Sequence, residues 1–496
     1  MIFLGLDVGS SGCKCVAFSE DGKFIYKCYK EYATRAGQSD MNPNEMLSSV
    51  FEVIKGCSAN INSNEVCAIS ITSFGESFVP VDKNGNALSD IIMYTDKRGL
   101  AETDMLVEKL GKEKIMGITC DKPDAMYSLP KIIWSIQNIP NVRDNVWKFL
   151  LIGDYIAFKL SGEAKINYSL ACRSLTFDVE KRCLSEDILN AAGLSPDLFS
   201  QPVPCGSVVG DIIPSIAQEL GLPKTTKIII SAHDQVAAAI GAGVLNEGEA
   251  VDGTGSVECI TPVFKGIVKN NDFTNNNFVC VPHPAGDNLY ATYAFNFAGG
   301  VSLKWFRDCF ASNLKPEAAK RGVSVYRILD ENCATSPSSV IVVPHFMGAG
   351  GTPDLVANAK GTITGLDMAK GLPDIYRGFM EGLTYEMAYN LEVLEKFNVK
   401  VDSLKATGGG ATSPIWLRIK SDILRRPITP LVTDEAGAAG CAMLAAVTMG
   451  KYNSLHEAAE KFVIYGETVY PNDEFADIYK EKYEKYKKVR NCLLNL

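Results

Sequence analysis

The chain has 496 residues, too many for one hydrophobic core, because single cores stop growing at about 250–300 residues. Hydrophobic residues make up 46% of it and charged residues 22%, which excludes a disordered chain. The formal net charge of −9 excludes a broad basic surface for nucleic acid or anionic lipid. We therefore expect two globular domains of similar size.

The N-terminal residues MIFLGLDVGSSG predict a first strand, because they lack the basic lead and the long apolar run of a secretory signal. No stretch reaches the roughly 18 apolar residues of a membrane helix. The 15 cysteines are dispersed without CxxC pairs, which favours reduced thiols. We expect a cytoplasmic protein with no membrane or nucleic-acid partner.

The first half predicts a mixed α/β sheet. Strands are expected at residues 2–7, 13–19, 24–31, 66–73 and 227–231. The first three are joined by Gly-rich and Asp-Gly turns, which suit an antiparallel meander, and a helix is expected over 43–55. The strand at 66–73 is apolar throughout, as in a sheet covered on both faces. Residues from about 74 to 225 mix helices with short strands and are interpreted as an insertion.

The second half begins like the first. The sequence DGTGS at 252–256 lies between strand-like runs and resembles DVGSS at 7–11. Further elements are expected as helices over 373–396, 414–424 and 435–449 and a strand over 403–407. The chain therefore predicts two related halves, with an N-terminal domain at 1–245 and a C-terminal domain at 246–496.

The first Gly-rich turn differs from a dinucleotide-binding fingerprint, because a second strand follows it instead of a helix. Backbone N–H groups in such a hairpin can surround phosphate oxygens, and Asp7 can hold Mg²⁺ through water. The alternative is an ordinary Gly-rich hairpin. The second copy, with Thr254, Gly255 and Ser256 as expected contacts, favours two hairpins that hold the β- and γ-phosphates.

A third Gly-rich element, TGGGAT at 407–412, follows a predicted strand and precedes a helix. Glycines allow adenine or ribose to approach the backbone, although close strand-to-helix packing is an alternative explanation.

The sequence SAHDQ at 231–235 stands where a buried strand ends and a helix begins. Open α/β folds bind ligands at such strand ends, so Asp234 is the candidate catalytic base and Gln235 a candidate partner for a substrate hydroxyl. The alternative for Asp234 is a helix N-cap. His233 has no acidic or cysteine partner at metal-binding spacing, and we interpret it as structural.

The chain resembles the FGGY family of carbohydrate kinases over nearly its whole length. The resemblance is carried by GLDVGSSGCK, YTDKRG, AHDQVAAAIGAG, DGTGS, AGGVSLKWFRD, GLTYEMAYNLEVLE, TGGGATSPIWLRIKSDILRRPI and EAGAAGCAMLA in this order. It implies an α/β fold of two actin-like, ribonuclease H-like domains, with the sugar and ATP bound in a cleft between them.

The resemblance also implies roles for individual residues. Asp7 matches the aspartate linked to Mg²⁺, and Asp234 matches the base. The nucleotide-contact segments correspond to Ser10, Ser11, Lys14, Thr254, Gly255, Ser256, Gly300, Lys304, Gly409 and Gly410. The acceptor side corresponds to Gly75, Glu76, Tyr94, Asp96, Asp234 and Gln235.

The acceptor side departs from the best-known relatives. Glycerol kinases carry an Arg-Glu pair and typical xylulokinases a Met-His pair where this chain has Gly75 and Glu76. A ketopentose such as xylulose is the expected acceptor; ribulose, fuculose, gluconate, erythritol or glycerol are alternatives. An ATPase that resembles actin or Hsp70, or a sugar-sensing module without catalysis, stays open, as does a homodimer.

Overall fold

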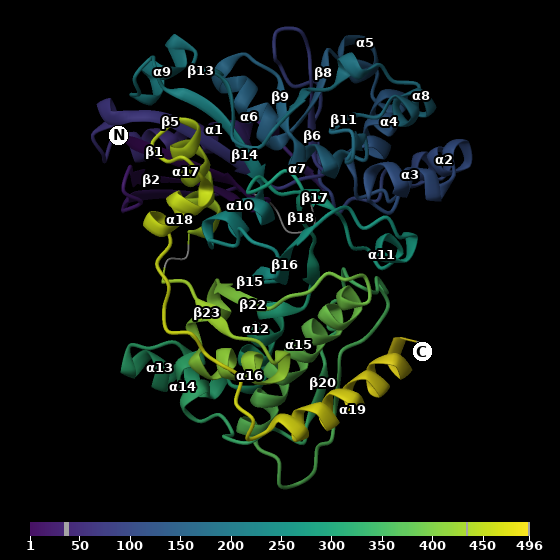
Figure 1. Ribbon diagram of the computed structural model, residues 1–496, viewed down its shortest axis with the longest axis vertical. Helices are drawn as coiled ribbons and strands as arrows, with labels where there is room; N and C mark the ends of the chain where they lie inside the picture. Colours follow the sequence, from purple (N-terminus) through teal and green to yellow (C-terminus); the bar gives the residue numbers. More distant parts are fainter. Residues whose placement is uncertain (34–38, 433–434, 495–496) are drawn as a thin grey trace.

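The computed structural model describes residues 1–33, 39–432 and 435–494, and it folds into two α/β halves (Figure 1). The N-terminal elements form the upper half of Figure 1, and most C-terminal elements form the lower half. Each half is built on one large sheet. Within these described ranges, no helix is long and apolar enough to cross a membrane.

The first sheet has the strand order β13-β14-β5-β1-β2-β3. Its strands are β1 (Ile2–Val8), β2 (Gly12–Ser19), β3 (Phe24–Glu31), β5 (Val66–Ser73), β13 (Ser207–Asp211) and β14 (Lys227–His233). β1 and β2 form an antiparallel hairpin, β5 runs parallel to β1, and β14 runs parallel to β5. β1, β5 and β14 are almost entirely buried, which explains their apolar sequences. Helix α1 (Pro43–Ser58) packs on β2 and β3.

The second sheet repeats this plan. Its strands are β15 (Glu249–Thr254), β16 (Glu258–Lys265), β17 (Val281–Pro282), β18 (Leu289–Ala291), β19 (Ala294–Asn296), β22 (Ser403–Thr407) and β23 (Ile428–Pro430). β15 and β16 form an antiparallel hairpin, β22 runs parallel to β15, and β23 runs parallel to β22. The two halves therefore share their central topology, as the repeated Gly-rich motif predicted.

Short helices and strands lie between β5 and β13. They are β6 (Phe78–Val81), β7 (Ile91–Ile92), α2 (Leu100–Leu110), α3 (Lys112–Thr119), α4 (Ser128–Asn138), α5 (Pro140–Asn145), β8 (Lys148–Leu151), α6 (Ile152–Ser161), β9 (Lys165–Asn167), α7 (Tyr168–Ala171), the 3₁₀ helix η2 (Cys172–Ser174), β10 (Phe177–Asp178), β11 (Cys183–Leu184), α8 (Glu186–Ala192), the 3₁₀ helix η3 (Pro196–Leu198) and β12 (Gln201–Val203). Helix α9 (Pro214–Leu220) follows β13. This region has the mixed character expected of an insertion.

Further elements precede the second sheet in the chain, lie between its strands or follow it. They are α10 (Asp234–Gly241), α11 (Asn271–Asn275), α12 (Gly299–Phe310), α13 (Lys315–Arg321), α14 (Val325–Glu331), β20 (Ile341–Val343), β21 (Thr362–Thr364), α15 (Leu372–Glu395), α16 (Pro414–Leu424) and α19 (Ala476–Leu494). The long helix α15 packs against α12, α16 and β20.

Helices α17 (Ala436–Thr448) and α18 (Leu455–Phe462) return to the first half of the molecule (Figure 1). Small residues allow α17 to approach closely: a Cβ at Gly440 would lie 2.0 Å from the Ala237 carbonyl oxygen of α10. A Cβ at Gly5 of β1 would lie 2.2 Å from the carbonyl oxygen of Ala438. The domain division at 245/246 stays a prediction, and these two helices pack with the first sheet.

Candidate active site

Asp234 stands at the carboxyl end of β14, where α10 begins. The N-cap of α10 is His233, so Asp234 is the first residue of the helix and the N-cap alternative is wrong. Oδ1 of Asp234 is buried and accepts no hydrogen bond from the described residues. A buried carboxylate oxygen without a donor is unfavourable, and the hydroxyl of a ligand would satisfy it.

Asp7 on β1 is close enough to Asp234 to influence its ionisation. Burial raises the pKa of the Asp234 carboxyl, and the charge of Asp7 raises it further, to about 7. Lys14 faces Asp7 across the β1/β2 hairpin, and its Nζ lies 3.2 Å from Asp7 Oδ2 and 3.2 Å from Glu435 Oε2. Burial acts to lower the pKa of Lys14, but the two carboxylates outweigh it and raise this pKa. The first hairpin thus brings a carboxylate and an ammonium group near Asp234.

His233 connects the candidate base to the second half of the chain. Its Nδ1 lies 3.0 Å from the Tyr293 hydroxyl, and its Nε2 lies 3.3 Å from Asp234 Oδ1. Burial lowers the pKa of the His233 imidazole to about 3, so the ring is neutral at physiological pH. Tyr293 lies between β18 and β19 of the second sheet. The hydrogen bond between His233 and Tyr293 therefore links the two halves of the molecule next to Asp234, the candidate base.

The chain turns after β5 at Gly75 and Glu76, next to a buried arginine. Glu76 adopts a φ of +62° and is 7% exposed. Its Oε1 accepts a hydrogen bond from Arg173 Nε at 2.7 Å and lies 2.6 Å from Nη2. Nη1 of Arg173 lies 3.3 Å from Asp121 Oδ1, which also accepts a hydrogen bond from Tyr127 at 3.0 Å. Glu76 is therefore part of a buried charged cluster.

Tyr94 and Asp96 have different surroundings. The Tyr94 hydroxyl lies close to Ser10 of the first hairpin, and burial together with the nearby charge of Glu76 raises its pKa. Tyr94 therefore connects the hairpin to the Glu76 segment. Asp96 Oδ1 instead lies 2.7 Å from Nε of Arg98, so Asp96 forms an ion pair within its own turn.

The second hairpin, between β15 and β16, exposes Gly255 and Ser256 at its tip. Helix α12 begins against it: the Gly300 N–H donates to the Gly255 carbonyl at 3.0 Å, and the Val301 N–H donates to the Ser256 carbonyl at 2.9 Å. A Cβ at position 300 would lie 2.3 Å from the Gly255 oxygen, which explains the glycine. Two predicted nucleotide segments are therefore in contact, whereas Lys304 is exposed farther along α12.

The Gly-rich turn after β22 packs on the same hairpin. Gly408 has a φ of +79°, and a Cβ there would lie 2.6 Å from the Thr254 carbonyl oxygen. A Cβ at Gly410 would lie 2.6 Å from Thr254 Cβ, whereas Gly409 is exposed. Close packing thus explains why positions 408 and 410 are glycines, which agrees with the packing explanation given as the alternative for this turn. Gly409 lies at the surface.

Thr254 directs its hydroxyl into the protein, toward Lys420 of α16. Nζ of Lys420 donates to Asp252 Oδ2 at 2.5 Å and to Thr254 Oγ1 at 2.7 Å, and it lies 2.7 Å from Glu258 Oε1. All four residues are buried. Lys420 therefore links the two strands of the second hairpin. Because the Thr254 hydroxyl is bonded to Lys420, a phosphate at Thr254 would contact the Thr254 backbone.

The sequence interpretation did not single out three residues of this region: Arg173, Tyr293 and Lys420. Arg173 and Tyr293 lie in stretches without a recognised motif, and their partners are distant in sequence. Lys420 could have been recognised from the sequence as a buried lysine, because it follows Trp416 by four residues and so lies on the same, buried face of α16.

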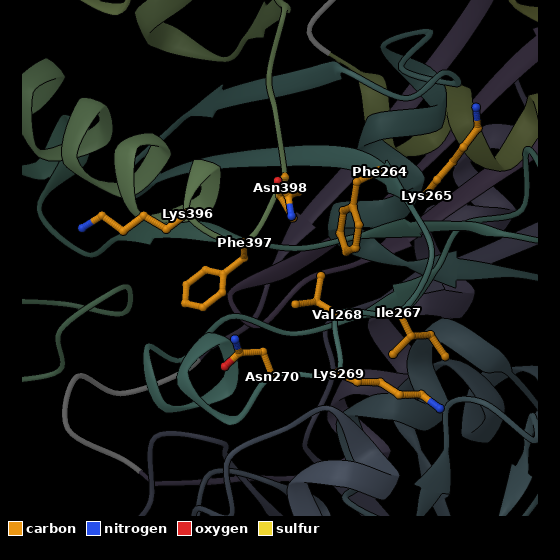
Figure 2. A pocket seen from close by; sticks show the side chains of 10 residues that line it. Phe264, Lys265, Ile267, Val268, Lys269, Asn270, Lys396, Phe397 and Asn398 are labelled. Atoms are coloured by element: carbon orange, nitrogen blue, oxygen red, sulfur yellow. The ribbon is translucent and has the colours of Figure 1, made fainter.

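Figure 2 shows a cavity of about 370 Å³ between the end of β16 and the segment after α15. Its lysines extend away from one another, and two of them form ion pairs, Lys265 with Glu247 and Lys269 with Glu180. None of the predicted site residues lines this cavity.

Two family models match the chain: the N-terminal domain of the FGGY family of carbohydrate kinases over residues 2–241, and the C-terminal domain of this family over 264–449. Xylulose kinase of Bacillus subtilis is 28% identical over 491 residues, 98% of this chain and 96% of the relative.

Two solved structures from Lactobacillus acidophilus match almost equally. The gluconate kinase has a TM-score of 0.88 and the ligand-bound xylulose kinase one of 0.87, each at 21% identity over 99% of this chain and 98% of the other. The expected α/β fold of two actin-like domains is confirmed. These two structures share that fold although their names give different acceptors.

Proposed function

Because the chain belongs to the FGGY family of carbohydrate kinases, we propose that it transfers the γ-phosphoryl group of ATP to a hydroxyl of a small sugar or polyol. A ketopentose such as xylulose is the proposed acceptor, which the full-length similarity to a xylulose kinase supports. The observation that carries the proposal is the buried Oδ1 of Asp234, which lies 3.3 Å from Nε2 of the neutral His233 but forms no hydrogen bond within the described residues.

Asp234 acts as the base in this proposal. The acceptor oxygen forms a bond to the γ-phosphorus, the bond between that phosphorus and the departing ADP oxygen breaks, and the hydroxyl proton passes to the Asp234 carboxylate. The transition state is loose, so the protein contributes mainly by positioning the reactants and neutralising charge. The proposed acceptor contacts are Gly75, Glu76, Tyr94, Asp96 and Gln235.

ATP is held in this proposal by the two hairpins and the Gly-rich turn. Backbone N–H groups of such turns suit phosphate oxygens, and a lysine adds positive charge. The proposed contacts are Ser10, Ser11, Lys14, Thr254, Gly255, Ser256, Gly300, Lys304, Gly409 and Gly410.

We propose Asp7 as the residue that holds Mg²⁺. Magnesium is usually bound by one or two carboxylates together with substrate phosphates and water. The Asp7 side chain is partly exposed, at 18%, and its charge influences Asp234, so the residues present fit this ion. When bound, the ion would neutralise charge on the phosphates.

The test of this function is ADP release by the purified protein with ATP and Mg²⁺, in the presence and absence of xylulose, ribulose, fuculose, erythritol and glycerol. We expect release only when an acceptor is present, and its loss with a chelator. Equal ATP hydrolysis without any acceptor would contradict the proposal and favour an ATPase resembling actin. Sugar binding without ATP turnover would instead favour a sensing module.

The pH dependence should report the ionisation of Asp234. The carboxylate is the active form, and its pKa is raised to about 7, so kcat/KM for the acceptor should fall as pH decreases below this value. We expect about a tenfold decrease per pH unit on this limb, measured at ATP concentrations well below saturation. A constant kcat/KM between about pH 8 and pH 5 would contradict the role of Asp234.

We also propose a cytoplasmic location and leave a homodimer as a hypothesis, which the mass of the purified protein in solution would test.

A further inference from the structure

The cluster around Arg173 contains more carboxylates than its guanidinium can neutralise. Arg173 is 4% exposed, and its Nε and Nη2 both contact Glu76 Oε1, at 2.7 Å and 2.6 Å. Its Nη1 lies 3.3 Å from Oδ1 of Asp121. Two carboxylates therefore surround one cation, and Asp234 stands nearby as a third acid.

Gly75 makes room for this arrangement. A Cβ at position 75 would lie 2.7 Å from Arg173 Cγ and 2.8 Å from Arg173 Cβ. Backbone-proximal atoms of a buried side chain cannot move aside easily, so a larger residue at 75 would displace the arginine. Gly75 and Arg173 thus form a matched pair that directs the guanidinium toward Glu76.

A second buried cation, Lys131, lies near the cluster, and backbone carbonyls use its donors. Its Nζ donates to the carbonyl oxygens of Ala125 at 2.6 Å, Met126 at 3.0 Å and Tyr94 at 3.4 Å. An ammonium group has three donors, and all three are used. The donors of Lys131 are therefore used by backbone carbonyls, and each of the three nitrogens of Arg173 already faces a carboxylate, so an anionic ligand would compete with Glu76 and Asp121 for the guanidinium.

The unsatisfied atoms of the cluster are hydrogen-bond acceptors. Oδ1 of Asp234 and Oδ2 of Asp121 are buried and accept no hydrogen bond from the part of the chain that the structure describes. Hydroxyl groups can donate to such oxygens, whereas a carboxylate cannot and is repelled by them.

We propose that the acceptor of this kinase is a neutral polyhydroxy compound and that the Glu76–Arg173–Asp121 cluster rejects a sugar acid. The inference rests on the proposed function, because it assumes that the acceptor binds beside Asp234.

The test compares polyols with their acids: D-glucitol with D-gluconate, and xylitol with D-xylonate. The members of each pair share a carbon skeleton and differ in a terminal CH₂OH or carboxylate. ADP release gives kcat/KM, and inhibition of the best neutral acceptor gives the affinity of each compound. At pH 8 we expect each polyol to bind at least about tenfold more tightly than its acid.

The Asp121→Asn variant tests the origin of this preference. Burial raises the pKa of Asp121 to about 7, so its carboxyl is ionised at pH 8 and the substitution removes one negative charge from the cluster. The preference for the polyol should decrease severalfold. Asp187→Asn, on α8 and 58% exposed, removes the same charge far from the cluster and should leave the preference unchanged.

Three outcomes are informative. Tighter binding or faster turnover of the acids by the wild-type protein would overturn the inference while the kinase function stands. An equal loss of preference in Asp121→Asn and Asp187→Asn would overturn the role of the cluster. Absence of phosphoryl transfer to any acceptor, together with no inhibition or binding, would overturn the proposed function and the inference with it.

Discussion

Asp234→Asn should abolish phosphoryl transfer while ATP binding survives. Asparagine has nearly the same size and shape, but its amide cannot take the acceptor proton. Positioned acid–base groups contribute about 10²- to 10⁴-fold, so we expect kcat to fall by this factor. ATP affinity should be retained or become tighter, because the substitution removes a negative charge near Asp7 and the phosphates. Acceptor-dependent ADP release and a direct ATP titration measure the two quantities.

The matched control is Asp187→Asn, because Asp187 also lies in the first turn of a helix and makes the same change of charge. It should keep wild-type kcat. A kcat for Asp234→Asn within about threefold of wild type would exclude Asp234 as the base, since that loss is far below the usual contribution of such a group.

Lys420→Met should strongly destabilise the second half of the molecule. It leaves the buried carboxylates of Asp252 and Glu258 without their cation, and breaking a buried ion pair in this way costs about 3–5 kcal/mol. For a domain of this size, the unfolding midpoint should fall by roughly 6–20 °C. Thermal unfolding followed by circular dichroism measures this decrease.

The pH dependence of the stability of Lys420→Met distinguishes the loss of the lysine's charge from the loss of its packing. Burial raises the pKa of Glu258 to about 7, and the charge of Lys420 acts to lower it. Without Lys420 this pKa should rise further above its unfolded value, so the folded variant binds a proton more readily than the unfolded chain. The deficit of the variant should therefore be largest at about pH 8 and decrease toward pH 5.

Lys405→Met is the matched control, because Lys405 lies on the adjacent strand β22 and its Nζ lies over the ring of Tyr465, 4.5 Å from the ring centre. It should change stability by about 1 kcal/mol or less. An unfolding midpoint of Lys420→Met equal to that of Lys405→Met would contradict the structural role of Lys420.

Local patterns predicted most of the fold. The apolar runs of β1, β5 and β14 and the glycines between β1 and β2 are readable because hydrophobic period and turn chemistry act over a few residues. The repeated hairpin was visible for the same reason. The return of α17 to the first sheet was not predicted, because it depends on contacts between Gly440 and Ala237, two hundred residues apart.

The residues of the candidate site likewise fall into two groups, those that short motifs predict and those that only long-range contacts bring to the site. Asp7 and Asp234 stand in short motifs with a clear place at strand ends, so their positions could be predicted. Arg173 has no motif of its own, and it reaches Glu76 only through the folding of the insertion. Tyr293 likewise reaches His233 from the other half of the molecule. Acceptor chemistry depends on such long-range pairs, which a single sequence does not reveal.

The most direct measurement follows the phosphorus of ATP in the complete reaction. Phosphorus NMR of the purified protein with Mg²⁺, ATP and D-xylulose should show a sugar phosphate ester and ADP appearing together in equal amounts. The same mixture without the sugar should retain its ATP. Inorganic phosphate in place of the ester, at the same rate with and without sugar, would contradict the assignment of this chain as a carbohydrate kinase.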